Sequence, residues 1–156
     1  MTKKVVSICN GKLIPLRMVS DKIFSQRLAG DGIGIVPYDS KFVSPVDGVV
    51  KIMMKGGHSM VIEQEDGANI MVHIGIQTVN LNGAGITSHI KKGQKVKVGD
   101  LLAEIDLEFM QSRKIDLTSV VLVMDPRDVK NLTTNDRGSA ASGRTVIIEY
   151  EGVVTK

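Results

Sequence analysis

The sequence predicts an all-β fold, an antiparallel β-sandwich or barrel-like domain with a few short helices. Glycine is frequent and proline is rare, with 16 Gly and 4 Pro among 156 residues, and turn-forming pairs such as Asp47-Gly48 and Asp66-Gly67 recur at short intervals. Between the turns lie short runs of β-branched and aliphatic residues, which are typical of strands in a sandwich or barrel. Strands do not alternate with long helices, and this argues against a doubly wound α/β fold.

The predicted elements follow from these patterns in chain order. The clearest strands are expected at 48–54, 60–64, 70–76 and 145–153. Ser20 is suited to cap a helix that runs through Leu28 and ends at Gly30. Asp106 is suited to cap a second helix over 107–114, and Pro126 to start a single turn at 127–130. The length matches one domain, residues 1–156.

Composition excludes several classes of protein. Only 3% of the residues are aromatic, too few for a nucleic-acid binder built on base stacking. The net charge is +3, but the densest lysine cluster, Lys91 to Lys97, alternates with Gly and Val as a solvated strand edge does. We therefore expect no nucleic-acid partner.

The sequence also argues against membrane insertion and against export. No apolar run approaches the roughly 20 residues that a spanning helix needs, and the N-terminus lacks the apolar segment of a signal peptide. Cys9 is the single cysteine, so neither an internal disulfide nor a multi-cysteine zinc site can form. These features predict a cytoplasmic protein.

Two of the three histidines flank one predicted hairpin. A two-residue turn at Asp66-Gly67 would pair His58 with Gly75 and His73 with Met60. A turn two residues longer would pair His58 with His73 directly. Either register places both imidazoles on one face, and only an odd slip or a bulge would separate them.

This shared face would carry an apolar patch rather than the core. The opposite face of the second strand has an unbroken core stripe of Ile70, Val72, Ile74 and Ile76, so His73 would point away from the core, toward a patch that includes Met71. A lone strand histidine is usually a surface residue without a task. Two on one face suggest metal ligation, acid–base chemistry or nucleophilic attack by a neutral imidazole.

Four segments carry a family resemblance. GDGIGIVP, SPVDGVV, VHIGIQTVNLNGAGI with a histidine fifteen residues before its own, and KKGQKVKVGDLLAEIDL occur in this order. In order and spacing they resemble the glucose-type IIA proteins of the bacterial phosphoenolpyruvate:sugar phosphotransferase system. The resemblance runs from about Asn10 to the last strand, and it implies a compact antiparallel β-sandwich.

The resemblance implies a role for each matching residue. His73 matches the histidine that accepts a phosphoryl group from the phosphocarrier protein HPr and passes it to a cysteine of a sugar-specific IIB domain. His58 matches the second histidine, which bonds the phosphoryl oxygens and supports onward transfer. Gly75 matches the residue whose carbonyl orients the acceptor ring. No cofactor is implied, and some members also bind and regulate other cytoplasmic proteins.

The sequence departs from the family at the rim of the site. Gly56 stands where a threonine is usual, and Gln77 where an acid commonly meets an arginine of HPr, whereas the acid near the first helix is kept as Asp21. Methionines replace the aromatic residues of the docking surface. The residues expected in this partner patch are Met54, Met60, Met71, Val79, Ile23 and Leu28.

Two other functions compete with phosphoryl transfer. A zinc-dependent hydrolase of related architecture would need a His-x-His pair, but Ile74 and Gly75 follow His73. His58 and His73 would then hold at most an adventitious zinc ion, completed by a partner's carboxylate. The second alternative is a non-catalytic regulatory binding module of the same fold. It would form no phosphohistidine.

Overall fold

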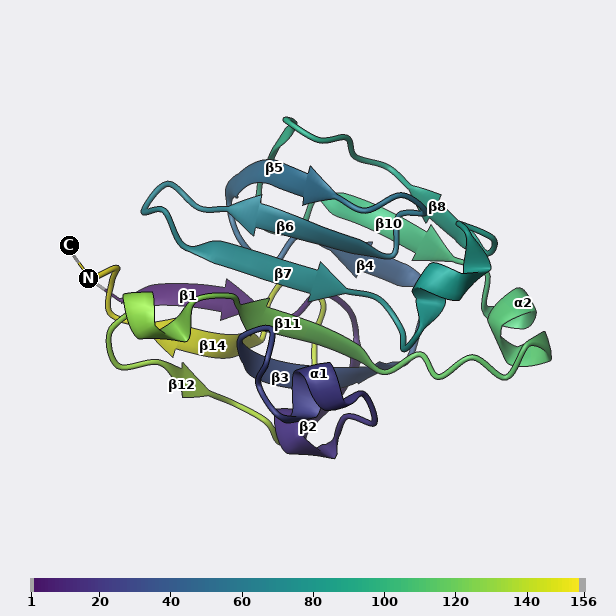
Figure 1. Cartoon of the computed structure of the whole chain (residues 1–156), viewed down its shortest axis with the longest axis horizontal. Coiled ribbons are helices and arrows are strands. Elements are labelled where there is room, and N and C mark those ends of the chain that lie inside the picture. The colour runs from purple at the N-terminus through teal and green to yellow at the C-terminus, as the bar shows by residue number, and fades with distance from the viewer. Residues whose placement is uncertain (1, 155–156) are drawn as a thin grey trace.

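The computed structural model describes residues 2–154. The ends of the predicted 1–156 domain, Met1 and residues 155–156, lie outside the described part. The described strands form one large and two small sheets, and every strand pairing within them is antiparallel (Figure 1). This confirms the predicted all-β fold with few short helices.

The large sheet has eight strands. In spatial order they are β13 (Ser139–Ala140), β2 (Gly11–Pro15), β3 (Asp31–Pro37), β11 (Ser119–Val123), β7 (Asn69–His73), β6 (Ser59–Glu63), β5 (Gly48–Met53) and β9 (Lys95–Val96). One small sheet contains β1 (Lys3–Val6), β14 (Val146–Tyr150) and β12 (Thr133–Thr134). The other contains β4 (Lys41–Val43), β10 (Leu101–Ile105) and β8 (Ile86–Ser88).

The helices are short and lie in the connections. They are α1 (Lys22–Ser25) and α2 (Leu107–Ser112), with single 3₁₀ turns at η1 (Leu16–Met18), η2 (Thr78–Leu81) and η3 (Pro126–Asp128). None of the helices in residues 2–154 has the length and apolar character that crossing a lipid bilayer requires.

The main core lies between the large sheet and the two small ones. It contains fully buried residues from all three sheets, among them Phe42, Ile62, Leu102 and Tyr150. A smaller apolar cluster lies on the outer face of the large sheet, where η1 and α1 cover β11 (Figure 1). The large sheet is therefore covered by apolar contacts on both faces around its middle strands.

The cap of the first helix differs from the sequence prediction. Asp21, not Ser20, caps α1, because its Oδ1 accepts from the N–H of Ile23 at 2.9 Å. The helix also ends earlier than expected, since Arg27 takes a left-handed conformation with φ 57°. The predicted cap at Asp106 is confirmed: its side chain accepts from the N–H of Phe109 at 3.0 Å.

The β6–β7 hairpin has a three-residue tip. The N–H of Gln64 donates to the carbonyl of Ala68 at 2.9 Å, and Gly67 is left-handed with φ 92°, as in hairpins with a turn followed by a left-handed residue. In the strands, Ser59 pairs with His73. The predicted pairings of His73 with Met60 or His58 are therefore wrong by one residue.

Candidate functional site

His73 lies at the end of a central strand. It is the last residue of β7, which is flanked by β11 and β6 in the large sheet. It pairs with Val120 on one side and with Ser59 on the other. Its half-buried ring stands on the outer face, at the margin of the smaller apolar cluster that includes Phe24.

One ring nitrogen of His73 is held by the backbone. Nδ1 lies 2.9 Å from the carbonyl oxygen of Gly75, which requires Nδ1 to donate its proton. Gly75 can turn its carbonyl back because it adopts φ 73°, a left-handed conformation that favours glycine. Nε2 has no hydrogen-bond partner in residues 2–154. The neutral ring therefore keeps its lone pair on Nε2.

Two other rings contact His73. The Phe24 ring meets it edge to face, with centroids 5.0 Å apart, and the His58 ring lies at 5.5 Å with a similar orientation. Phe24 was not singled out by the sequence pattern, although it falls in the helix predicted there. Its side chain packs against one side of the His73 ring, and His58 occupies another.

His58 reaches His73 from a bend and not from a strand. It precedes β6, directly after Gly56 and Gly57, which are both left-handed with φ 101° and 79°. In a continuous strand the observed register would point His58 to the opposite face. The bend removes this alternation, and the carbonyl of His58 accepts from the N–H of Ile74 at 2.7 Å. The predicted closeness of the two rings is confirmed, while the predicted reason is wrong.

The glycine at position 56 fits its local backbone. A Cβ there would lie 3.2 Å from the nitrogen of Gly83 and 3.4 Å from Nδ1 of His58, and the φ of 101° would strain a side chain. A threonine at this position would need a different bend. Within the described residues the His58 ring has no hydrogen-bond partner, so packing holds it, and it is only 3% exposed.

Both imidazoles are held toward the neutral form. Burial lowers the pKa of His58. Burial is also the main cause that lowers the pKa of His73, followed by the neighbouring His58, while the bond to Gly75 and the charge of Asp21 act in the opposite direction. A neutral imidazole with a free Nε2 is a nucleophile, and its neighbour can donate an N–H to an anion bound there.

The electrostatic contributions predict opposite effects of two substitutions on the His73 titration. His58→Gln should raise the pKa of His73, because it removes a group that lowers it. Asp21→Asn should lower that pKa, because the carboxylate that favours the imidazolium is lost. NMR titration of the His73 ring in the isolated protein measures both. Shifts of the same sign in the two variants would contradict this electrostatic description.

Most of the residues predicted for the partner patch are exposed. Ile23 is 54% exposed, Leu28 70%, Met54 46% and Val79 52%, and Met71 is half-buried. An apolar hollow of about 300 Å³ adjoins the ring. It is lined by Ile23, Phe24, Met54, Met71 and Met124, among others.

Met60 does not belong to this patch. Its pairing with Val72 turns its side chain toward the main core, where it is fully buried. The prediction failed because it rested on the wrong hairpin register. Val61 instead pairs with Met71 and shares the face of His73.

The two polar positions predicted at the rim are near the patch. Asp21 is partly exposed, and its charge acts on His73. Gln77 is exposed and left-handed, with φ 57°, immediately before η2. Asp21 and Gln77 also line one shallow hollow with Lys114 and Asp116.

Residues 2–154 contain no cluster of side chains that would form a metal centre. No group of three or more His, Cys, Asp or Glu residues within 2–154 is arranged to hold a metal ion. His58 and His73 supply two nitrogen ligands, fewer than a catalytic zinc site uses.

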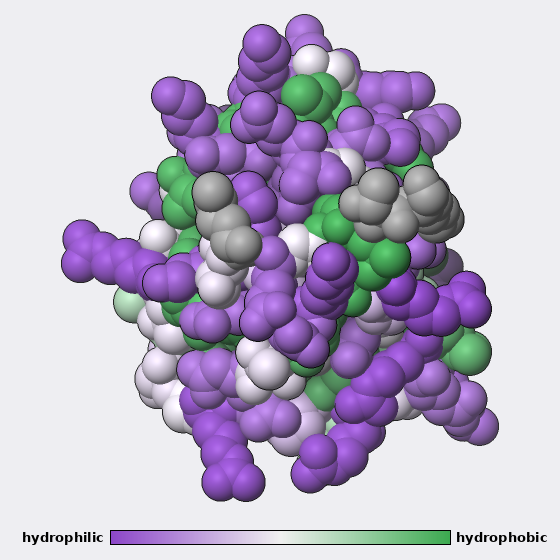
Figure 2. Space-filling view, turned by 90° about the vertical axis from the view of Figure 1, so that its left-hand side faces the viewer, coloured by the Kyte–Doolittle hydropathy of each residue, from purple (hydrophilic) through white to green (hydrophobic). Residues whose placement is uncertain are grey.

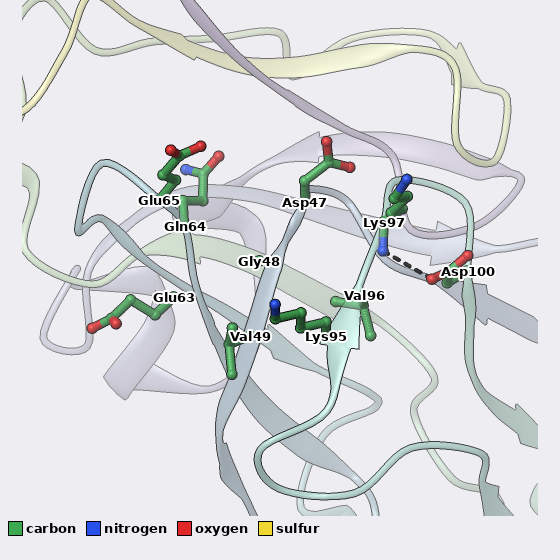
Figure 3. A pocket seen from close by; sticks show the side chains of 10 residues that line it. All are labelled: Asp47, Gly48, Val49, Glu63, Gln64, Glu65, Lys95, Val96, Lys97 and Asp100. Atoms are coloured by element: carbon green, nitrogen blue, oxygen red, sulfur yellow. Dashed lines mark hydrogen bonds between the residues drawn. The ribbon is translucent and has the colours of Figure 1, made fainter.

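A larger hollow lies elsewhere and has no histidine in its lining. It measures about 610 Å³ and is bordered by β5, β6 and β9 (Figure 3). Its polar groups are largely satisfied: Asp100 accepts from the N–H of Lys97 at 2.8 Å, and Asp47 from that of Val98 at 2.8 Å.

The end of the molecule that carries the termini is largely hydrophilic (Figure 2). The histidine pair is therefore the candidate site.

A family model described as phosphoenolpyruvate-dependent sugar phosphotransferase system, EIIA 1, matches residues 3–129. The chain belongs to this family. It is 36% identical over 135 residues to the PTS system glucose-specific EIIA component of Oceanobacillus iheyensis, with 85% of this chain and 82% of that protein covered. The glucose permease IIA of Mycoplasma capricolum has the same fold, with a TM-score of 0.88, 30% identity and 96% of each chain covered.

Longer EIIA relatives contain the domain as one part. The PTS system glucose-specific EIICBA component of Streptococcus pneumoniae is 34% identical over 151 residues, which cover 97% of this chain and 21% of that protein. As an EIIA component the chain is a phosphotransferase of sugar uptake. Nothing in these similarities supports a zinc hydrolase.

Proposed function

We propose that His73 is the phosphoryl acceptor of this EIIA protein and that its donor is phosphorylated HPr. The observation that carries the proposal is the His73 ring itself. Gly75 fixes its Nδ1 by a 2.9 Å hydrogen bond, so the lone pair of Nε2 is left free in a half-buried ring. In-line phosphoryl transfer needs a positioned nucleophile and donors for the equatorial oxygens, with little other covalent work.

His58 is the group that stabilises the phosphoryl oxygens and supports onward transfer to the cysteine of a IIB domain. Its ring lies 5.5 Å from that of His73, close enough for an N–H of His58 to donate to the oxygens of a phosphoryl group carried on Nε2 of His73. Attack by the cysteine forms an S–P bond while the N–P bond breaks. The protonated His73 ring is a good leaving group. The relatives that combine A, B and C units in one chain support a IIB partner.

The surroundings suit two protein partners in turn. Ile23, Leu28, Met54 and Val79 are exposed apolar side chains that we assign to the partner patch, and methionine adapts to different partner surfaces. We place the protein in the cytoplasm, where phosphoenolpyruvate is made, and we treat residues 1–156 as one phosphocarrier domain. One core cluster that includes both Val5 and Tyr150 supports a single domain.

The direct test is phosphorylation by purified components. After incubation with phosphoenolpyruvate, enzyme I and HPr, intact mass should rise by one phosphoryl group, and the adduct should be acid-labile and alkali-stable. Leaving out HPr should abolish the adduct. An unmodified chain in the complete mixture would instead favour the regulatory binding module.

The glutamine at the rim gives a prediction for the HPr step. Gln77→Asp should speed phosphorylation by HPr about three-fold at low ionic strength, because a rim charge facing a basic partner acts mainly on the association rate. The advantage should shrink as salt screens it. Aspartate also tolerates the left-handed backbone found at this position.

The rate is measured by stopped flow at a series of salt concentrations. Two variants serve as controls. Gln77→Asn has the same backbone preference without the charge and should give no salt-dependent gain. Asp21→Asn should slow the step and keep the fold, because asparagine caps helices about as well as aspartate. A rate for Gln77→Asp that is lower, or insensitive to salt, would contradict the electrostatic account.

A further inference from the structure

The peptide group that precedes Gly75 is held on both sides by buried hydroxyls. The Thr78 hydroxyl donates to the carbonyl of Ile74 at 2.6 Å. The N–H of Gly75 donates to the hydroxyl oxygen of Ser119 at 3.1 Å. The carbonyl of Ile74 and the N–H of Gly75 belong to one peptide unit, so the plane of this peptide has a partner at each edge.

Both hydroxyls have a defined direction. Ser119 donates its own proton to the carbonyl of Leu117 at 2.9 Å, so its oxygen lone pairs remain for Gly75. Thr78 and Ser119 are both fully buried. Water does not compete for these bonds, and losing one would leave a buried polar group unpaired.

The following peptide continues the same network. The carbonyl of Gly75 accepts from Nδ1 of His73, and the N–H of Ile76, in the same peptide unit, donates to the carbonyl of Asp116 at 2.8 Å. Consecutive hydrogen bonds through a peptide group polarise one another. Backbone groups just before β11 thus connect to the imidazole through a single peptide.

This segment needs such support because its backbone is otherwise free to rotate. β7 ends at His73, and residues 74–77 lie outside any strand. Gly75 and Gln77 both have positive φ angles, 73° and 57°. Glycine has access to many conformations, so local preference alone does not aim the Gly75 carbonyl at His73.

We infer that Thr78 and Ser119 are positioning residues that keep the proton of His73 on Nδ1 by clamping the Ile74–Gly75 peptide. With the clamp in place, the Gly75 carbonyl accepts from Nδ1, and the Nε2 lone pair is presented to the phosphoryl donor. Without it, the carbonyl moves and the tautomer protonated on Nε2, which has no lone pair there, becomes populated. This inference rests on the proposed role of His73 as the acceptor.

Position 78 allows a matched test. Thr78→Val removes the hydroxyl and keeps the methyl group that packs over Gly75, whereas Thr78→Ser keeps the hydroxyl and removes that methyl. Thr78→Val should populate the Nε2-protonated tautomer of His73 and slow phosphorylation by HPr about ten-fold, the scale of a small misplacement of a reacting group. Thr78→Ser should retain the original tautomer and most of the rate.

The tautomer is read from the ¹⁵N shifts of the His73 ring in the unphosphorylated chain. Ser119→Ala should shift it in the same direction as Thr78→Val. Ser44→Ala is the control, because it removes another fully buried hydroxyl that is not in contact with the histidines. The Ser44 hydroxyl donates to the carbonyl of Val46, at 2.7 Å. It should change neither the tautomer nor the rate.

Two results would overturn the clamp. One is an unchanged His73 tautomer in folded Thr78→Val, and the other is a Thr78→Ser variant that loses as much rate as Thr78→Val. If Ser119→Ala does not fold, the pair at position 78 decides alone. The tautomer measurement uses no partner protein, so failure of the clamp is distinct from failure of the acceptor assignment, which His73→Gln tests.

Discussion

A chain carrying His73→Gln should take up no phosphoryl group from HPr. The expected loss is more than ~10³-fold, because glutamine has no nucleophilic nitrogen and the covalent intermediate cannot form. His58 should not take over, since it is only 3% exposed, and the Nε2 of His89 lies 3.3 Å from the carboxylate of Glu104. Intact mass after incubation with phosphoenolpyruvate, enzyme I and HPr measures the loss.

The same substitution leaves most of the fold in place. His73 is at the end of β7, and its ring stands on the outer face of the sheet rather than in the main core. Amide NMR spectra should therefore match those of the unchanged chain outside the site. Phosphate uptake at the original level by a folded His73→Gln chain would refute the acceptor assignment.

The second large effect is expected for His58→Gln, which should still accept a phosphoryl group but fail to pass it on. The amide can donate a hydrogen bond to the phosphoryl oxygens, the role proposed for the imidazole, but it cannot change its protonation state during transfer. Loss of such a group slows a step by roughly 10²–10⁴-fold. The phosphorylated variant should accumulate when a IIB domain and sugar are supplied.

Separate measurement of the two half-reactions makes this test sharp. Loading by HPr is followed without IIB, and unloading starts when IIB is added to the isolated phosphorylated chain. His89→Gln is a suitable control, because His89 is more than a third exposed and its Nε2 lies 3.3 Å from a carboxylate oxygen of Glu104. Unloading of His58→Gln at the rate of this control would remove His58 from the mechanism.

The sequence correctly predicted that the rings of His58 and His73 lie close together, but it gave the wrong register for the hairpin between them. Alternation fixes which strand residues share a face, but the tip length sets the register, and Asp66-Gly67 is compatible with tips of two or three residues. Three are found, so Met60 turns into the core and Val61 takes its place. The fold class survived this error because it depends on the spacing of turns and not on any one register.

The contacts that tune the site were beyond a sequence-based argument. Phe24 and Ser119 come from α1 and β11, far from His73 along the chain, and meet it only through tertiary packing. A composition of β-branched strands and polar turns does not specify such pairs. Asp21 was expected for its charge, and its second role as the cap of α1 follows from a hydrogen bond that Ser20 could equally have supplied.

The site has a rigid part, on the central strand β7, and an adaptable part, on the surrounding helical turns and connections. The strand lies between two neighbours within the eight-stranded sheet, so its amides should exchange with solvent only in rare, extensive openings. The partner-patch residues Ile23, Leu28 and Val79 stand on short helical turns and connections, which open more readily. In the proposed function, successive partners can thus reshape the contact surface while the nucleophilic nitrogen stays where the sheet holds it.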